Sequence, residues 1–432
     1  MAVGALADGC SVKIAVVGAG PAGLTAARIL AANAHRPVVF EASDWIGGRT
    51  RTIRRDGHAV DVGAGWLASF YTETFRLLAA VGLDESLDQL DLAGASCLSD
   101  HGEIIDVPAT ASEAISTQII PLAEKLRLVA WAAALLIRQP QANLKPDLRF
   151  DKIDADSHIT RAVGPKAAER VFTPMVSAVF SDLSELSAAL LRSWVRAGVG
   201  ARFYALEGGM DSLWTRIAED LDVRTDTPVR NIAMGRGSGI DISTDSGSSE
   251  RFDACVVAAP ITRVRSIIEG ADLPHWLDDM RYAPHFRVYA AIEGTLERAD
   301  IHPLESDEHV ATVSRGPAGR LWGVIPEGHS AALVGSSGSW SHDLIDASDA
   351  AEQLWGRARE IDRGLFELSD AVLVESIRWD EAVPVMAPGH FARVKTLEQR
   401  PPLVFAGDWL VQPCIEGAVR SGIGAAKHFG LA

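Results

Sequence analysis

Cysteine is scarce in this chain, and the few cysteines present are not grouped. The four residues Cys10, Cys97, Cys255 and Cys414 lie far apart and include no CxxC pair. This spacing indicates neither a disulfide framework nor a zinc site. Two catalytic signatures are also missing, because the sequence contains no GxSxG and no HExxH, and its 12 histidines show no metal-ligand spacing. Neither serine-hydrolase nor zinc-hydrolase chemistry is therefore indicated.

Basic side chains are outnumbered by acidic ones. The chain has 41 Lys and Arg against 57 Asp and Glu, a formal net charge of −16. Nucleic-acid binding depends on clustered Lys and Arg that neutralise phosphates. The acidic balance thus argues against a nucleic-acid partner and against an anionic membrane surface, and it leaves a small-molecule substrate as the expected partner.

Long apolar runs are missing as well. The longest, Val129–Ile137, falls short of the ~20 residues that span a bilayer. The first residues, MAVGALADGC, have neither the basic start nor the apolar core of a signal peptide. We expect no transmembrane segment and, by default, a cytoplasmic enzyme. At 432 residues the chain can bury one large core or two joined cores, and its oligomeric state is left open.

A stretch near the N-terminus has the order of elements that binds a dinucleotide. Val12–Val17 is a β-branched run typical of a buried parallel strand. The turn Gly18–Gly23 follows at once, and an Ala/Leu-rich helix comes after it. A second apolar strand, Pro37–Phe40, ends on Glu41. This succession of strand, glycine turn, helix, strand and acidic residue predicts a Rossmann-like, dinucleotide-binding fold.

The residues of the glycine turn have separate physical roles. Gly18 allows a tight turn out of the strand, and Gly20 has no Cβ, so backbone N–H groups can approach a pyrophosphate. Gly23 allows helix and strand to pack closely, and with Ala22 it leads into the helix whose N-terminus favours an anion. Glu41 follows Gly18 by 23 positions and can accept hydrogen bonds from an adenosine ribose. A glycine-rich turn without a ligand is the alternative interpretation.

A second glycine turn comes shortly after the ribose acid. Gly47–Thr50 reads Gly-Gly-Arg-Thr, and a plain nicotinamide-binding domain has no use for such a turn there. Gly48 and Arg49 can hold the far side of the same pyrophosphate, Arg49 through a bidentate contact. At these residues the chain resembles the flavin-containing amine oxidase superfamily, which includes monoamine oxidases, protoporphyrinogen oxidases and carotenoid or squalene desaturases. The resemblance implies FAD as the cofactor.

Later segments resemble those with which this superfamily completes its FAD site. The segment Asp61–Trp66 is expected to pass the flavin ring, with a strand bulge as the alternative interpretation. Val229 stands where a valine backbone meets the adenine, and Asp408 is expected beside the ribityl chain and phosphates. The terminal helix, which begins near Ile415, is expected to direct its first amides at the flavin's pyrimidine carbonyl. The residues expected to bind FAD in these segments are Gly63, Ala64, Gly65, Trp66, Val229, Gly407, Asp408, Ile415, Gly417 and Ala418.

The resemblance implies an α/β fold in which two domains are interleaved. Segments 1–75, 203–270 and 390–432 are assigned to a discontinuous Rossmann-like FAD-binding domain. Segments 76–202 and 271–389 are assigned to a substrate-binding domain made of an antiparallel sheet and a helical insertion. The predicted domain boundaries thus cut the chain four times.

The substrate domain is expected to have a helical part and a sheet part. Residues 71–202 are predicted to be mostly helical, with a loop from Gln139. The clearest helix, Glu124–Arg138, either lies on a membrane surface or is an ordinary core helix. Alternating residues after Ile261 predict the antiparallel sheet. Its expected strands are Arg287–Ile292, Arg320–Val324, Ala331–Ser336 and Val372–Trp379.

Two departures from the superfamily leave the substrate open. Amine oxidases usually carry a lysine near the flavin's reactive nitrogen, and Arg287 stands nearest that position here. An arginine stays charged and cannot act as a neutral base. The alternative interpretation is that Arg287 points to the other face of its strand and pairs with a surface carboxylate. Cys414 replaces a cage aromatic, so Trp379, Trp409 and Trp66 either line the pocket or pack in the core. Arg287 and Trp379 are the candidate catalytic residues.

The sequence predicts an FAD-dependent oxidoreductase that takes a hydride from a small organic substrate and passes electrons to dioxygen or another acceptor. Two reactions remain open: C–N oxidation to an imine, as in amine oxidases, and C–C dehydrogenation of an apolar substrate, as in protoporphyrinogen oxidases and desaturases. A flavin protein that acts only as a structural or binding module is the third possibility. Since the superfamily's covalent thioether lies in a different local sequence from Cys414, we expect non-covalent FAD.

Overall fold

The computed structural model describes residues 11–430 with interruptions. The segments outside the described part are 1–10, 56–57, 91, 99–103, 107–115, 139–143, 178, 180–181, 236–238, 297–298, 304–309, 311, 318–322, 325–327, 339–340, 342–343, 345–346, 363–370 and 431–432. The N-terminal ten residues, the start of the loop expected from Gln139 and the start of the strand expected from Arg320 lie there.

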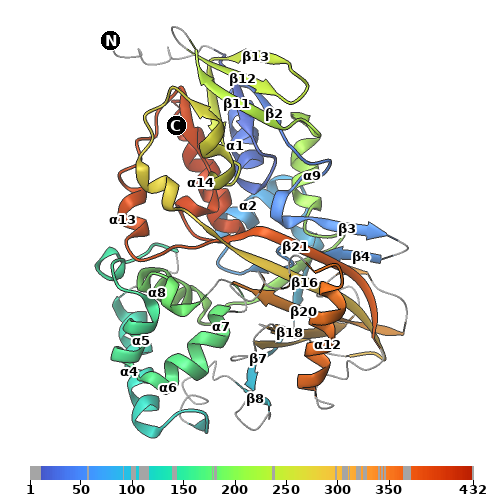
Figure 1. Cartoon of the computed structure of the whole chain (residues 1–432), viewed down its shortest axis with the longest axis vertical. Coiled ribbons are helices and arrows are strands. Elements are labelled where there is room, and N and C mark those ends of the chain that lie inside the picture. The colour runs from blue at the N-terminus through green and yellow to red at the C-terminus, as the bar shows by residue number, and fades with distance from the viewer. Residues whose placement is uncertain are drawn as a thin grey trace.

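A five-stranded parallel sheet forms the centre of the nucleotide-binding half, at the top of Figure 1. Each strand pairs in parallel with its neighbour, and the apolar residues of the central strand β1 are buried on both faces. The sheet confirms the predicted α/β fold class. Its strands, in spatial order, are β10 (Asp222–Arg224), β2 (Arg36–Phe40), β1 (Lys13–Val17), β14 (Ala254–Val257) and β22 (Leu403–Phe405).

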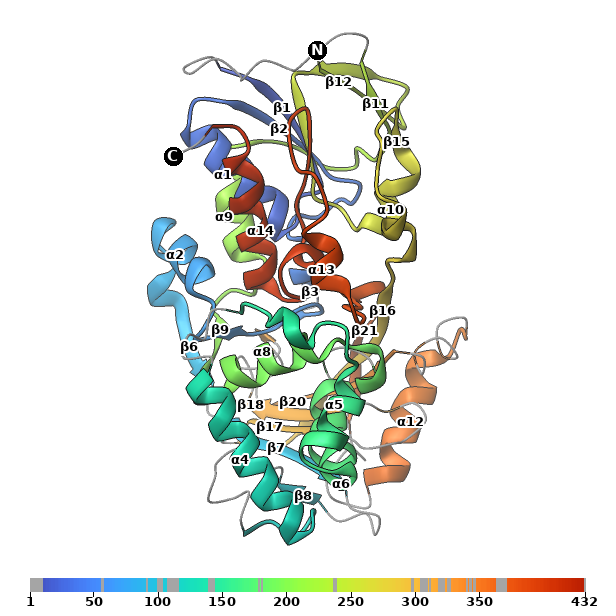
Figure 2. The same ribbon diagram turned by 90° about the vertical axis from the view of Figure 1, so that its left-hand side faces the viewer.

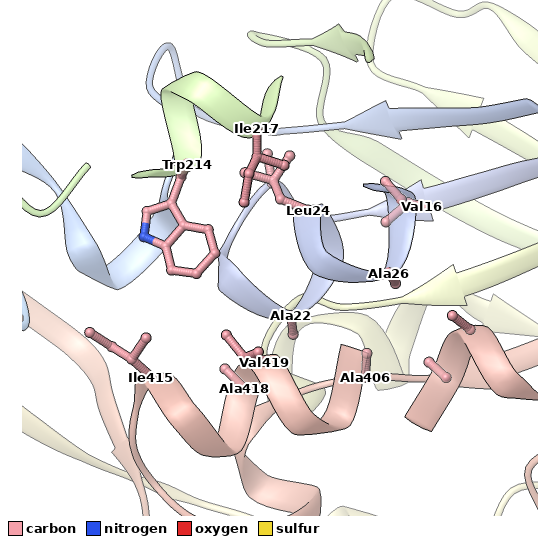
Figure 3. Close-up of a cluster of buried hydrophobic side chains, with 14 of the residues drawn as sticks. Val16, Ala22, Leu24, Ala26, Trp214, Ile217, Ala406, Ile415, Ala418 and Val419 are labelled. Carbon is pink, nitrogen blue, oxygen red and sulfur yellow. The ribbon is translucent and has the colours of Figure 1, made fainter. Parts of the chain in front are cut away.

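Two helices pack closely against each other on one face of this sheet. They are α1 (Pro21–Ala32) and α14 (Ile415–Lys427), which come from opposite ends of the chain. A Cβ on Gly422 would lie 2.3 Å from the carbonyl oxygen of Ala22, so glycine allows this approach. Figure 3 shows the α14 side chains directed at α1, with Trp214 closing one end of the cluster. The contact places Gly422, the eighth residue of α14, against the first turn of α1.

A smaller sheet covers the other face of the parallel sheet. Its apolar residues, among them Ile232, Ile242 and Phe252, pack in one cluster with Ala15 and Val17 of β1. Its strands, in spatial order, are β13 (Ser249–Phe252), β12 (Ile240–Thr244), β11 (Val229–Met234) and β15 (Ile268–Glu269).

A seven-stranded sheet forms the centre of the other half and confirms the expected mainly antiparallel sheet. The pairing of β17 with β7 is parallel, and the other described pairs are antiparallel. Helix α12 (Ala350–Asp362) packs on it (Figure 1). Its strands, in spatial order, are β21 (Val372–Pro384), β16 (Tyr282–Glu293), β20 (His329–Ser337), β18 (Thr312–Pro317), β17 (Ala299–Pro303), β7 (Leu92–Leu98) and β8 (Ile104–Asp106).

Two expectations about the substrate half need correction. The described end of the expected strand Arg320–Val324, β19 (Gly323–Val324), pairs with β4 (His58–Asp61) instead of joining the large sheet. Strand β4 also pairs antiparallel with β3 (Thr52–Arg55). Residues 71–202 are less helical than expected, since β6 (Leu87–Leu90), β7 and β8 lie among them. Strands β6 and β7 pair with β9 (Phe203–Leu206) and β17, far away in the chain, so the local pattern did not indicate these pairings. Strands β7 and β8 also pair with each other, a local pairing that the helical expectation missed.

Residues 122–198 are mainly helical and lie at the lower left in Figure 1 and in the lower half of Figure 2. The longest, α4 (Leu122–Arg138), buries Leu128, Trp131 and Leu135 in a cluster with other helices of this part. On this face α4 is a core helix. No helix in the described ranges is long and apolar enough to cross a membrane. The remaining elements are α2 (Thr72–Ala80), α5 (Ala155–Ala162), α6 (Pro165–Ala167), α7 (Thr173–Ser177), α8 (Ala188–Gly198), α9 (Ser212–Ala218), α10 (Ile261–Val264), α13 (His390–Val394), β5 (Leu67–Ala68) and β9 (Phe203–Leu206).

Candidate functional site

Two glycines of the first turn are required by the fold itself. Gly18 has φ of +109°, and a Cβ there would lie 3.0 Å from the backbone of Ala258 on the neighbouring strand's exit. A Cβ on Gly23 would lie 2.0 Å from the carbonyl oxygen of Gly18. Since real Cβ atoms do not approach so closely, both positions admit only glycine. Their roles therefore match the tight turn and the close helix packing that the sequence predicts.

Gly20 differs from these two because no part of the chain crowds it. A Cβ on Gly20 would meet only the Cα of Gly48, at 4.0 Å, while Gly48 has φ of +53° and faces Gly20 from the second turn. A side chain at position 20 would occupy the space that an anion needs to reach the amides at the start of α1. The two turns thus touch through their glycines, and no side chain lies within 4 Å of a Cβ built on Gly20. Such a junction fits a pyrophosphate at the N-terminus of α1, and so a dinucleotide cofactor.

Glu41 is held at the carboxyl end of β2 by backbone donors. Its Oε2 accepts the N–H of Ala19 at 2.8 Å, and its Oε1 accepts that of Ser43 at 3.0 Å. The backbone N–H of Thr227 donates to the Glu41 carbonyl oxygen at 2.8 Å, which places the segment leading to Val229 alongside it. Each carboxylate oxygen has a second lone pair for a ribose hydroxyl. The predicted ribose and adenine residues are therefore neighbours.

Arg49 joins three distant parts of the chain. Its guanidinium donates to Asp408 Oδ1 at 2.8 Å and to the carbonyl oxygen of Ala382 at 2.7 Å. Burial lowers the pKa of Arg49, but the Asp408 carboxylate outweighs it and, with Tyr282, raises the pKa overall. Arg49 therefore stays charged beside the pyrophosphate space. Its predicted bidentate contact with the pyrophosphate stays a prediction.

The terminal helix begins in a tightly built loop. The Sγ of Cys414 accepts the N–H of Gly417 at 3.4 Å, and a Cβ on Gly417 would lie 1.9 Å from the carbonyl oxygen of Gln412. Burial raises the pKa of Cys414 to about 12, so the thiol is protonated and a poor nucleophile. Ile415 and Ala418 direct their side chains at the α1 cluster (Figure 3). The Ala418 N–H donates to the Cys414 carbonyl oxygen at 3.0 Å, so the amide expected to contact the cofactor is used within the helix.

The segment Asp61–Trp66 lies between the second glycine turn and the large sheet. On one side, Ala64 donates its N–H to the carbonyl oxygen of Arg49 at 2.9 Å. A Cβ on Gly63 would lie 2.0 Å from that same oxygen, so the turn and the segment touch directly. Among the wider neighbours, Trp66 stacks near Phe203, with ring centroids 5.9 Å apart. The close backbone contact explains the small residues at positions 63 and 64.

Two side chains of the large sheet hold the same segment from the opposite side. Arg287 on β16 donates from Nη1 to the carbonyl oxygen of Gly63 at 2.9 Å. Trp379 on β21 donates from Nε1 to the carbonyl oxygen of Val62 at 2.8 Å. Arg287 thus faces the flavin segment, and its described partners include no surface carboxylate. Both candidate catalytic residues lie at one place, next to the residues expected to face the ring.

Sequence reasoning missed two features of this place. His285 accepts from Arg287 Nη2 through Nδ1 at 3.4 Å, and the strand's two-residue alternation could have located it. Asp61 is buried and accepts the Thr52 hydroxyl at 2.5 Å and the Met210 N–H at 3.0 Å through one oxygen. Burial raises the pKa of Asp61 to about 6 despite these hydrogen bonds.

Two further residues named from the sequence, Trp409 and Ala22, are used in packing. Trp409 is buried against Phe405 and Trp276, so it packs in the core. Ala22 contributes to the contact of α1 with α14. Within the described ranges, no group of three or more His, Cys, Asp or Glu side chains could hold a metal ion.

Comparison with known proteins points to one family. The sequence model described as flavin containing amine oxidoreductase matches residues 21–428. Polyamine oxidase 4 of Oryza sativa subsp. japonica is 24% identical over 273 residues, which is 61% of this chain and 55% of that protein. The chain therefore spans little more than half of the length of this relative.

Two further matches extend over nearly the whole chain. Coproporphyrinogen III oxidase of Mycobacterium bovis is 26% identical over 443 aligned positions, 94% of this chain and 95% of that protein. The structure of cyclohexylamine oxidase from Brevibacterium oxydans superposes with a TM-score of 0.76 at 19% identity, covering 97% of this chain and 99% of that one. At this identity the superposition establishes a common fold.

Proposed function

The chain belongs to the flavin-containing amine oxidoreductase family, which uses FAD, and we propose that it dehydrogenates a neutral or anionic organic substrate at a carbon–carbon bond. One observation carries the proposal: the Arg287 guanidinium lies 2.9 Å from the carbonyl oxygen of Gly63, inside the segment expected to face the flavin ring. Arginine is charged at every physiological pH. A fixed cation therefore stands where the substrate is expected to meet the cofactor.

This cation discriminates between substrates by charge. A protonated amine about 4 Å away would be repelled by ~1 kcal/mol in water, and by more in a drier pocket. A carboxylate or a neutral carbon skeleton meets no such penalty. Arg287 also offers no neutral base, because an arginine side chain in a protein is always charged. The residue types at this place thus favour C–H removal from a substrate that is not cationic.

The protein's own part in the reaction is to bind and orient. Bound non-covalently, FAD supplies the hydride acceptor, and dioxygen or another acceptor takes the electrons. The glycine junction of Gly20 and Gly48 would hold the pyrophosphate, Glu41 the ribose, and Asp408 the ribityl side. The first amides of α14, at Ile415 and Glu416, would favour the negative charge that reduced flavin gathers at its pyrimidine carbonyl, since the Gly417 N–H already donates to Cys414 Sγ.

Oxidation of an amine to an imine is the second candidate, and the similarity to polyamine oxidase 4 favours it. With Arg287 in place, such an amine would have to bind in its neutral form. Its oxidation rate would then rise about tenfold per pH unit below the amine's own pKa, since each unit multiplies the neutral fraction by ten. A carbon–carbon substrate without a titrating group would show no such dependence.

Anaerobic reduction of the flavin tests the proposal. We expect polyenes and carboxylated cyclic substrates to bleach the bound flavin, and protonated amines to do so slowly. Arg287→Met should slow reduction by an anionic substrate roughly tenfold, equivalent to ~1.4 kcal/mol of lost electrostatic contact. Arg287→Lys should retain more of the rate because the charge remains.

The matched control is Arg378→Met, which removes an exposed arginine of β21 that pairs with Asp380 at 2.6 Å. This variant should reduce at the wild-type rate, and all variants should hold equal amounts of FAD. Fast reduction by amines at a pH far below their pKa would contradict the proposal. Unchanged rates in both Arg287 variants would place this side chain outside the active site.

A further inference from the structure

The outward face of α4 carries an apolar stripe that the helical core does not use. Leu122, Leu126 and Ile137 have 64%, 60% and 78% of their surface exposed. With exposed Ala130 and Ala133 they follow one another at intervals of three or four residues. At about 100° per residue these five positions fall within an arc of about 80°. They therefore form one continuous stripe along the helix, opposite the buried Leu128, Trp131 and Leu135.

The charges of α4 are divided between its two faces. Glu124, the only acidic residue of the helix, is buried, and its carboxylate accepts the N–H of Ala167 at 2.7 Å. Lys125 is buried as well. Arg127 is exposed and lies beside the stripe. The outward face of α4 thus combines apolar side chains with a basic flank and has no carboxylate of its own.

The surrounding helical part differs in charge from the rest of the chain. Residues 122–198 have eleven basic and eight acidic side chains, a net charge of +3, whereas the remaining residues have 30 and 49, a net charge of −19. The net charge of −16 therefore hides a local reversal of sign. The overall charge argues against binding of the whole molecule to an anionic membrane surface, but the charge of residues 122–198 does not.

We propose that the outward face of α4 docks on an anionic membrane surface. An interfacial helix lies flat, inserts its apolar face among the acyl chains and keeps its arginines at the level of the lipid headgroups. The stripe spans residues 122–137, about 22 Å at ~1.5 Å per residue, along the outer edge of the molecule in Figures 1 and 2. The charge complements anionic lipid, whereas a second copy of this face would bring like charges together.

Co-sedimentation of the FAD-loaded protein with lipid vesicles tests the proposal without any substrate. We expect binding to vesicles of phosphatidylcholine mixed with phosphatidylglycerol, and roughly tenfold weaker binding to phosphatidylcholine alone. Leu126→Glu and Ile137→Glu should each weaken binding at least about tenfold, because a carboxylate would enter the apolar layer. Arg127→Glu should weaken binding to the anionic vesicles alone.

Val372→Glu is the matched control, because Val372 is 63% exposed but lies on β21, away from α4. It should bind vesicles like the wild type, and all variants should keep the flavin spectrum and melting temperature of the wild type. The proposal fails if the wild type binds neither vesicle, or if Leu126→Glu binds as well as Val372→Glu. It also fails if ultracentrifugation finds a dimer that Leu126→Glu dissociates, since a second copy would then cover the stripe.

Discussion

The two halves of the molecule hold the segment Asp61–Trp66 in opposite ways. The nucleotide-binding half uses its backbone: the carbonyl oxygens of Arg49 and Arg51 accept the N–H groups of Ala64 and Val62. The sheet of the other half uses two long side chains, which donate to the carbonyl oxygens of residues 62 and 63. The first contact depends on glycines that permit close approach, and the second on particular side chains. Substitutions in the nucleotide-binding half should therefore abolish cofactor binding. Substitutions in the other half should change the rate of flavin reduction by degrees.

The largest effect is expected where a glycine faces the cofactor space. Gly20→Val should leave the apoprotein folded, because the protein leaves room for a side chain there, but should remove FAD binding by more than ~150-fold. Gly23→Val is the contrasting variant, because its side chain would collide with the Gly18 carbonyl oxygen, 2.0 Å from a Cβ. It should lower the melting temperature of the apoprotein. FAD titration with thermal unfolding checks both, and a folded Gly20→Val protein with normal FAD affinity would contradict the placement of the pyrophosphate.

The buried carboxyl of Asp61, at the junction of the two halves, should make the free energy of unfolding depend on pH. Its pKa is raised to about 6 by burial, above the ~3.9 of an unfolded aspartate. The folded state thus binds this proton more tightly, so the stabilisation is complete below about pH 4 and is lost as the pH rises through about 6. The loss is on the order of 3 kcal/mol.

Asp61→Asn should remove this pH dependence, because an amide oxygen can accept both hydrogen bonds that Oδ1 accepts. Denaturant unfolding of the FAD-loaded protein at pH values on both sides of 6 measures the difference. Asp44→Asn, at an exposed position, is the control and should behave like the wild type. Equal pH dependence in all three proteins would mean that Asp61 is ionised without penalty.

Glu41→Ala should have the next largest effect, and it acts within the nucleotide-binding half alone. A charge-assisted hydrogen bond contributes ~1.5–3 kcal/mol, so FAD affinity should fall by roughly 10- to 150-fold. The Ala19 and Ser43 N–H groups also lose their acceptor, which should loosen the first glycine turn. Calorimetric FAD titration measures the loss. Unchanged affinity would mean that Glu41 only holds the turn and does not reach the ribose.

The same contrast explains what could be read from the sequence. The parallel strands, the glycine turns and Glu41 lie within one short stretch, where the spacing alone specifies the geometry. Arg287 and Trp379 could be singled out, but not their partners, because Gly63 and Val62 are 224 and 317 positions away. The pairing of Arg49 with Asp408 spans 359 positions and has no local signal either. Likewise β7 pairs with β17, far along the chain, although it also pairs with the nearby β8, which the helical expectation missed.

The smallest expected effect belongs to Trp379→Phe, which keeps an aromatic ring but removes the donor to the Val62 carbonyl oxygen. One net hydrogen bond contributes ~0.5–1.5 kcal/mol, so flavin reduction should slow by about two- to tenfold while FAD affinity stays nearly constant. Trp355→Phe, the same change on helix α12, is the control and should leave the rate unaltered, because α12 packs on the opposite face of the large sheet, against Phe286 and Val288. Trp379 and Arg287 both support one short segment through its backbone carbonyls. The losses in reduction rate caused by Trp379→Phe and Arg287→Met should therefore be only partly additive in the double variant. Fully additive effects on the reduction rate would show that the two side chains act separately, and the contrast between backbone and side-chain support would then not describe this junction.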